Sequence, residues 1–253
     1  MELILEDELD EWVSRLPDIS LSPPSTHLLL LAVRSRYCRE IMNVKVKDMV
    51  VERKIIRPVT PWRDNYIQKV KNLAMLQRNG IYTFRDIGNI PYQGRAIYGT
   101  VIPRNVMAAS ADNISEAVRF MCRVGFMAED GMQFFTRGDL NFFSALHRHR
   151  LREAFHSITL DIDDPIVYEP VKDMVSGFDL WMITKTSRGY HIILDISETG
   201  AEEFHKGGGV WDKIHTKFPT QVELQRDSQE PIPGTLYYRV SEPEVPNYVR
   251  IIE

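Results

Sequence analysis

The sequence is poor in cysteine, and this scarcity excludes two classes of site. Only Cys38 and Cys122 occur among 253 residues, far apart along the chain. A cysteine-rich zinc knuckle and a disulfide framework both need more cysteines at closer spacing. Such sparse cysteine is also typical of a reducing compartment. We therefore expect a cytoplasmic protein without structural zinc.

The sequence also lacks long apolar runs and an excess of basic residues. Its longest apolar run, Leu28–Val33, is far short of the roughly 20 residues that span a bilayer, so we expect no membrane partner. The acidic N-terminal segment is unlike a signal or transit peptide. The formal net charge is −4, so any nucleic-acid site must come from local charge. The helicase-type motif GxxxxGK[ST] is missing as well.

What is present is the composition of an ordinary globular chain, with 43% hydrophobic and 26% charged residues. We expect an α/β (α+β) protein with a mostly helical N-terminal region, residues 1–94, and a strand-rich region, residues 95–253. Apolar spacing predicts helices over 4–16, 26–42, 62–77, 112–123 and 200–205, and strands over 49–56, 96–102, 155–163, 180–185, 190–196 and 221–224.

The most cationic part of the chain lies between Arg34 and Arg78, where basic residues clearly outnumber acidic ones. Arg34, Arg36 and Arg39 fall in the second half of the helix predicted over 26–42. Clustered arginines can neutralise phosphates of a nucleic-acid backbone, so these three are candidate DNA-binding residues. A merely solvated cationic face is an equally good interpretation.

Two aspartates share one face of a predicted strand. In the segment SITLDID, residues 157–163, isoleucine and leucine alternate with serine, threonine and aspartate. Since side chains repeat every two residues along a strand, Asp161 and Asp163 stand side by side. Their mutual repulsion is costly unless a cation lies between them, and hard divalent ions prefer such oxygen ligands. An ordinary pair of surface carboxylates is the alternative.

Donor groups gather at the start of another predicted strand. Ser187, Arg188 and Gly189 belong to the turn before this strand, and His191 lies just inside it. A hydroxyl, a guanidinium, an imidazole and exposed backbone amides together suit a triphosphate. A single histidine on a strand would more often be structural, but here it follows two other phosphate-type donors.

A third acidic group comes late in the chain. Glu223 and Asp227 lie on one face if the strand around residues 221–227 runs straight, and either could supply a third carboxylate. Alternatively, Asp227 simply opens a polar turn. The segment PIPGT, residues 231–235, follows directly.

The order of these segments resembles the archaeo-eukaryotic primase superfamily. The resemblance rests on LDIDD at 160–164, SRGYHI at 187–192 and a late acidic residue with PIPGT, supported by IYGTVIPRN at 97–105. It covers about residues 95–240 and is closest in style to plasmid and phage primase–polymerases. The zinc knuckle of cellular primase subunits is absent, and the third motif is ambiguous between Asp227 and Glu223.

This resemblance implies a fold, an activity and a set of metal ligands. The fold would be an RRM-like antiparallel sheet as catalytic core, joined to an N-terminal helical or α/β unit. The activity would be that of a DNA primase or primase–polymerase, a nucleotidyltransferase that uses two Mg²⁺ or Mn²⁺ ions and no zinc. Asp161 and Asp163 would hold both ions, and Asp227 or Glu223 would complete one site.

The resemblance also implies substrates and partners. The partners would be single-stranded DNA template, nucleoside triphosphates, and a helicase or accessory primase subunit. The setting would be the cytoplasm of a prokaryote or of a cell that carries a phage or plasmid, with the nucleus left open. The triphosphate would be bound by Ser187, Arg188, Gly189 and His191, with Lys185, Arg104 and Arg239 as further contacts to triphosphate or template.

Two other functions remain open from the residues. A metal-dependent nuclease or other phosphodiester enzyme could use the same carboxylates, although it would not need the donors around His191. A non-catalytic nucleic-acid-binding relative could keep only the sheet, but RRM-type sheets bind RNA through exposed aromatics. A sheet face that carries carboxylates would instead repel a nucleic-acid backbone.

Overall fold

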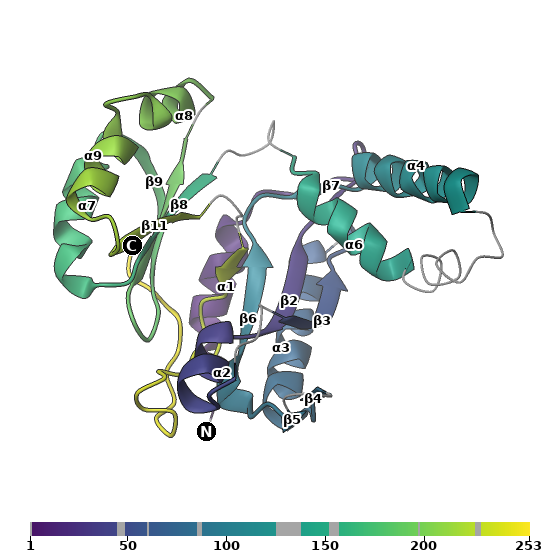
Figure 1. Ribbon diagram of the computed structural model, residues 1–253, viewed down its shortest axis with the longest axis horizontal. Helices are drawn as coiled ribbons and strands as arrows, with labels where there is room; N and C mark the ends of the chain where they lie inside the picture. The colour runs from purple at the N-terminus through teal and green to yellow at the C-terminus, as the bar shows by residue number, and fades with distance from the viewer. Residues whose placement is uncertain are drawn as a thin grey trace.

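The computed structural model describes residues 2–44, 49–59, 61–84, 88–124, 138–151, 157–196, 198–225 and 229–253. The described chain is an α+β protein built around two antiparallel sheets, as the sequence predicts for the fold class. One sheet has the strand order β12-β6-β2-β3, and the other has the order β11-β8-β10-β9-β13. Figure 1 shows the two sheets side by side, with α4 and α6 projecting away from both.

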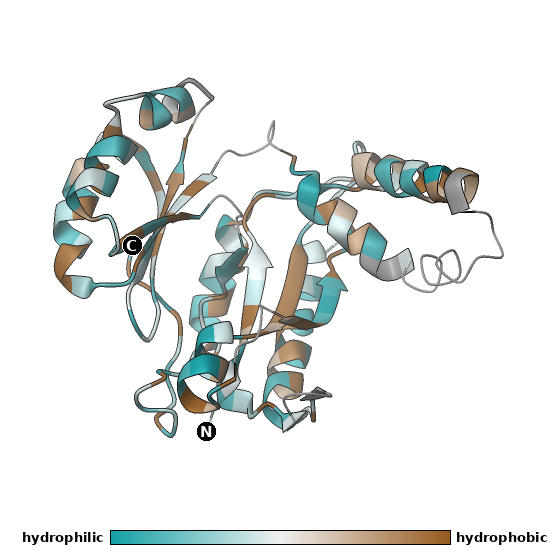
Figure 2. Cartoon of the chain, viewed as in Figure 1, coloured by the Kyte–Doolittle hydropathy of each residue, from teal (hydrophilic) through white to brown (hydrophobic). Residues whose placement is uncertain are grey.

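The four-stranded sheet is built around β2 (Leu28–Val33), in which every residue is buried. Its other strands are β3 (Met49–Ile55), β6 (Arg95–Thr100) and β12 (Gln229–Pro231). The helices α1 (Glu6–Arg15) and α3 (Trp62–Asn79) cover one face and form a common core with it. The hydropathy colouring in Figure 2 shows β2 as a continuous apolar strand.

The helix predicted over 26–42 is wrong in its first half. This segment forms the two-residue strand β1 (Ser25–Thr26), then β2, and only then the short helix α2 (Ser35–Ile41). The run LLLLAV is buried on both faces of a central strand, and such a run carries no alternation to distinguish it from a buried helix. The helices at 4–16 and 62–77 and the strand at 49–56 are confirmed within a few residues.

The five-stranded sheet contains β8 (Ser157–Ile162), β9 (Asp179–Lys185), β10 (Tyr190–Asp195), β11 (Val222–Gln225) and β13 (Arg250–Ile251). The alternation predicted for 157–163 is confirmed, because the isoleucines and leucine of β8 all join one apolar core. The helices α7 (Tyr168–Met174), α8 (Glu198–His205) and α9 (Val210–Lys217) lie on that side (Figure 1). The polar residues of β8 face the opposite way.

The two sheets are joined through a shared apolar core. Met182 of β9 and Ile193 of β10 pack with the core that α1 forms over the four-stranded sheet. The ring of Trp12 in α1 meets that of Trp181 edge-on at 5.5 Å between ring centroids. The carboxylate of Glu8 in α1 also accepts a hydrogen bond from the backbone of β13 at 2.6 Å.

The sheets do not divide the chain at residues 94 and 95, the boundary expected between two regions. Strand β6 begins there and pairs with β2, and β12 adds to β6 from near the C-terminus. The remaining elements are β4 (Thr83–Phe84), β5 (Gly88–Asn89), β7 (Arg104–Asn105), α4 (Val106–Val124), α6 (Gly138–Arg148) and the short 3-10 turns at 92–94 and 165–167. Among the described helices, none is long and apolar enough to cross a membrane.

Candidate active site

A cleft of about 480 Å³ lies between the two sheets and takes its lining from both. The polar wall comes from the five-stranded sheet and the turn after β9. The opposite wall is mostly apolar and includes Leu30, Ala32 and Tyr98, which occupy the face of β2 and β6 turned away from α1 and α3. The polar wall contains Asp161, Asp163, Thr186, Arg188, His191, Glu223 and Gln225.

Strand register places three of these side chains in one row. Asp161 on β8 is the register partner of His191 on β10 and of Glu223 on β11. Residues paired across adjacent strands point to the same face of the sheet. Asp163 lies two residues beyond Asp161 and lines the same cleft. The structure therefore brings together the residues of the DxD and SRGYH segments, and Glu223 with them.

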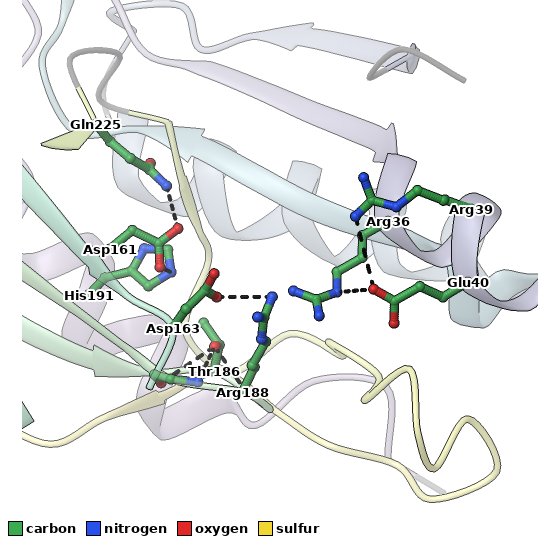
Figure 3. A network of polar contacts seen from close by, with 10 residues as sticks. Arg36, Arg39, Glu40, Asp161, Asp163, Thr186, Arg188, His191 and Gln225 are labelled. Carbon is green, nitrogen blue, oxygen red and sulfur yellow. Dashed lines mark hydrogen bonds and ion pairs between the residues drawn. The ribbon is translucent and has the colours of Figure 1, made fainter. Parts of the chain in front are cut away.

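Asp161 is held by one partner on each side. Its Oδ2 accepts a hydrogen bond from the side-chain amide of Gln225 at 2.8 Å. Its Oδ1 lies 3.5 Å from Nε2 of His191. Figure 3 shows both contacts converging on the Asp161 carboxylate from the neighbouring strands.

Asp163 lies between an arginine partner and other acidic side chains. Its Oδ1 pairs with Nη1 of Arg188 at 3.1 Å (Figure 3). Burial raises the pKa of Asp163, and the charges of Asp161 and Glu223 raise it further, while Arg36 opposes them. Burial and the two neighbouring carboxylates therefore both disfavour the ionised form of Asp163.

The turn between β9 and β10 depends on a glycine. The Thr186 hydroxyl accepts hydrogen bonds from the backbone amides of Arg188 and Gly189, at 3.4 and 3.3 Å. A Cβ atom on Gly189 would lie 1.8 Å from the carbonyl oxygen of Ile162, so only glycine lets the turn approach the end of β8. Ser187 is buried, and its hydroxyl has no hydrogen-bond partner among the described residues.

A buried acid that the sequence did not predict lies behind His191. Nδ1 of His191 lies 2.6 Å from Oε2 of Glu230, whose side chain is 0% exposed. Burial works against charge on this imidazole, yet Asp161, Glu230 and Asp163 together raise the pKa of His191 to about 9. The only sequence signal for Glu230 is an isolated acidic residue directly before the apolar PIPGT segment.

The basic residues predicted to bind DNA or nucleotide separate into several environments. Arg34 and Arg36 line the cleft. Arg34 is nearly buried, donates to the carbonyl of Tyr238 and lies over the Tyr237 ring at 3.9 Å, so it holds the C-terminal segment. Arg36 pairs with Glu40 at 2.5 Å.

The other four predicted cations lie away from the described cleft lining. Arg104 is fully buried and donates to the carbonyl of His147 at 3.2 Å, so a role in triphosphate binding is contradicted by its burial. Arg39 is exposed on α2. Lys185 lies over the Tyr190 ring at 5.6 Å, and Arg239 lies 3.7 Å from Glu242.

One of the two candidates for the third acidic group lies beside the aspartates, because Glu223 stands opposite Asp161 on the neighbouring strand. The other candidate, Asp227, lies outside the described residues. Across the described ranges, no group of three or more His, Cys, Asp or Glu side chains is gathered closely enough to hold a metal ion. Comparison with protein-family models, with curated proteins and with solved structures found no match to this chain.

Proposed function

We propose that this chain is a DNA-templated nucleotidyltransferase of the archaeo-eukaryotic primase type, which makes or extends a primer on single-stranded DNA. One observation carries the proposal: a pair of aspartates and a set of phosphate-type donors line the same cleft on adjacent strands. Asp161 and Asp163 come from β8, and Arg188 and His191 come from the turn and strand beside it. The five-stranded antiparallel sheet, with helices on one face, would be the RRM-like core.

The chemistry of the acidic groups in the cleft suits a divalent cation, although the described side chains are not gathered closely enough to hold one without moving together. Asp161, Asp163 and Glu223 offer carboxylate oxygens, the ligands that Mg²⁺ and Mn²⁺ prefer. Burial raises the pKa of Asp163 most, and the charges of Asp161 and Glu223 add to the increase. A bound cation would offset this repulsion between the carboxylates. The contacts of Asp161 with Gln225 and of Asp163 with Arg188 would compete with an ion. When bound, two such ions would activate an attacking 3′-hydroxyl and neutralise charge on the phosphates.

The residues of the chain itself would bind and orient the nucleotide. The Arg188 guanidinium can donate two parallel hydrogen bonds to phosphate oxygens, and a protonated His191 can donate one more. The buried hydroxyl of Ser187 is a further donor in the same turn. The apolar wall around Leu30 and Tyr98 would take up base and sugar, and exposed Arg39 would extend the basic surface toward the template.

The proposal is tested by nucleotide incorporation. The wild-type chain is incubated with single-stranded template, labelled nucleoside or deoxynucleoside triphosphates, and Mn²⁺ or Mg²⁺, with and without a primer. We expect primer synthesis or extension by the wild type and at least a hundredfold loss in Asp161→Asn with Asp163→Asn. Asp173→Asn, an exposed carboxylate on α7, is the matched control and should be fully active.

Two results would contradict the proposal. One is full incorporation by the double aspartate variant, since then the paired carboxylates are not part of the reaction. The other is that the wild type incorporates neither kind of nucleotide under any of these conditions. Strand cleavage that needs no triphosphate would instead identify the cleft as that of a nuclease.

A further inference from the structure

We propose that Glu230 is a positioning residue, whose buried carboxylate fixes the ring of His191 so that Nε2 presents a proton to an anionic group in the cleft. This inference deepens the proposed function and rests on it, because the anion would be the triphosphate. Glu230 itself does not line the cleft in the described residues, so it would act only through His191.

The hydrogen bond between the two residues fixes the ring. Oε2 of Glu230 lies 2.6 Å from Nδ1 of His191, and both side chains are almost completely buried. An ionised carboxylate only accepts hydrogen bonds, so Nδ1 must carry the proton. The ring plane and the direction of Nε2 are then set by the β12 backbone, which pairs Glu230 with Gly99 of β6.

The charge of the buried Glu230 carboxylate also favours a protonated His191 ring beside it. Its other oxygen, Oε1, has no hydrogen-bond partner among the described residues. A buried carboxylate is costly unless a cation accompanies it, and His191 is the group in contact with it.

The second ring proton is left available to a ligand. Nε2 lies 3.5 Å from Oδ1 of Asp161, which is longer than a good hydrogen bond. A phosphate oxygen that enters the cleft could therefore accept from Nε2 without displacing a strong contact. The arrangement also ties the two sheets together, because Glu230 belongs to the four-stranded sheet and His191 to the five-stranded sheet.

A double-mutant cycle tests the inference through nucleotide affinity. The dissociation constants of ATP and dATP are measured with Mn²⁺ for the wild type, Glu230→Gln, His191→Gln and the double variant. We expect Glu230→Gln to weaken binding about tenfold in the wild-type background and to have no further effect once His191 is glutamine. Thr184→Val is the matched control, since Thr184 is buried and is the register partner of His191 but does not line the cleft. The nucleotide affinity of this variant should equal that of the wild type.

Weaker nucleotide binding by Glu230→Gln could also result from disturbed aspartates, and the Mn²⁺ affinity measured without nucleotide distinguishes this cause from the loss of His191 positioning. It should be the same in Glu230→Gln and the wild type. The inference is overturned if Glu230→Gln binds both nucleotides as tightly as the wild type. It is also overturned if Glu230→Gln lowers the nucleotide affinity by the same factor in the His191→Gln background as in the wild-type background.

Nitrogen NMR of the His191 ring gives a readout that needs no ligand. The wild type should show a protonated Nδ1 in a strong hydrogen bond, with the signal assigned by its loss in His191→Gln. An unprotonated Nδ1 overturns the inference even if Glu230→Gln does not fold. If the wild type binds neither nucleotide, the proposed function fails, and the ring signal still decides whether Glu230 fixes His191.

Discussion

Replacing Gly189 with alanine should damage both the fold and the cleft, because this position allows the closest backbone approach at the site. The added Cβ would lie 1.8 Å from the carbonyl oxygen of Ile162 and 2.9 Å from its carbonyl carbon. Ordinary contacts of a Cβ atom begin at about 3.4 Å. Both obstructing atoms are backbone, so no side-chain rotation can relieve the overlap, and the turn must move away from β8.

The size of the effect follows from overpacking between paired strands. Insertions into packed regions typically cost about 1–3 kcal/mol, and backbone obstruction puts this variant at about 3 kcal/mol. For a chain of this length, such a loss lowers the unfolding temperature by roughly 6–12 °C. Movement of the turn would also separate Arg188 from Asp163, whose charged atoms lie 3.1 Å apart. Nucleotide affinity should therefore fall even at temperatures where the variant is folded.

Thermal unfolding monitored by circular dichroism, with ATP binding at 20 °C, measures both effects. Gly177→Ala is the matched control, because a Cβ there meets nothing within 4 Å and its φ is not positive. The control should unfold within about 2 °C of the wild type. An unchanged unfolding temperature for Gly189→Ala would refute the close approach of the turn to β8 on which the geometry of the cleft depends.

Two further predictions concern buried polar groups in the N-terminal core. Burial lowers the pKa of His27 to about 4, although the carbonyls of Pro17 and Thr100, each 2.9 Å from a ring nitrogen, oppose this. The unfolded chain takes up this proton near pH 6.5, so the wild type should lose about 3 kcal/mol relative to His27→Gln as the pH falls from 6.5 to 4 in urea titrations. A constant difference would show that the two carbonyls outweigh burial. The indole of Trp12 donates to the Tyr66 hydroxyl at 3.1 Å. Trp12→Phe and Tyr66→Phe should each lose about 1–3 kcal/mol of unfolding free energy, and the double variant less than their sum; strict additivity would contradict the coupling.

The features that could be predicted from the sequence are those that local periodicity determines. The two-residue alternation of 157–163 identified β8 and the face of Asp161 and Asp163, because the apolar residues of β8 all join the core formed with α7, α8 and α9. The prediction of a helix over 26–42 was wrong in its first half because this alternation is missing there. In β2 the residues on both faces are buried, so the pattern that distinguishes a strand from a helix is absent.

The parts of the site that depend on long-range docking could not be predicted. Glu230 meets His191 only because β12 returns to the four-stranded sheet and that sheet packs beside β10. The position of Glu223 opposite Asp161 follows from the register of β11 against β8, which the sequence left open. The burial of Arg104 likewise depends on its contact with α6, far along the chain.

Arg34, Arg36 and Arg39 look alike in the sequence, but the fold places them in different surroundings and so gives them different roles. Arg34 is used within the fold, Arg36 adds positive charge near Asp163, and Arg39 remains exposed on α2. Two of the three, Arg34 and Arg36, therefore line the cleft. The cleft also presents Asp161, Asp163 and Glu223, which would repel the phosphates of a nucleotide that enters without a cation. If the proposed function is right, it binds the nucleotide tightly only together with cations, and each should increase the affinity for the other by the same factor.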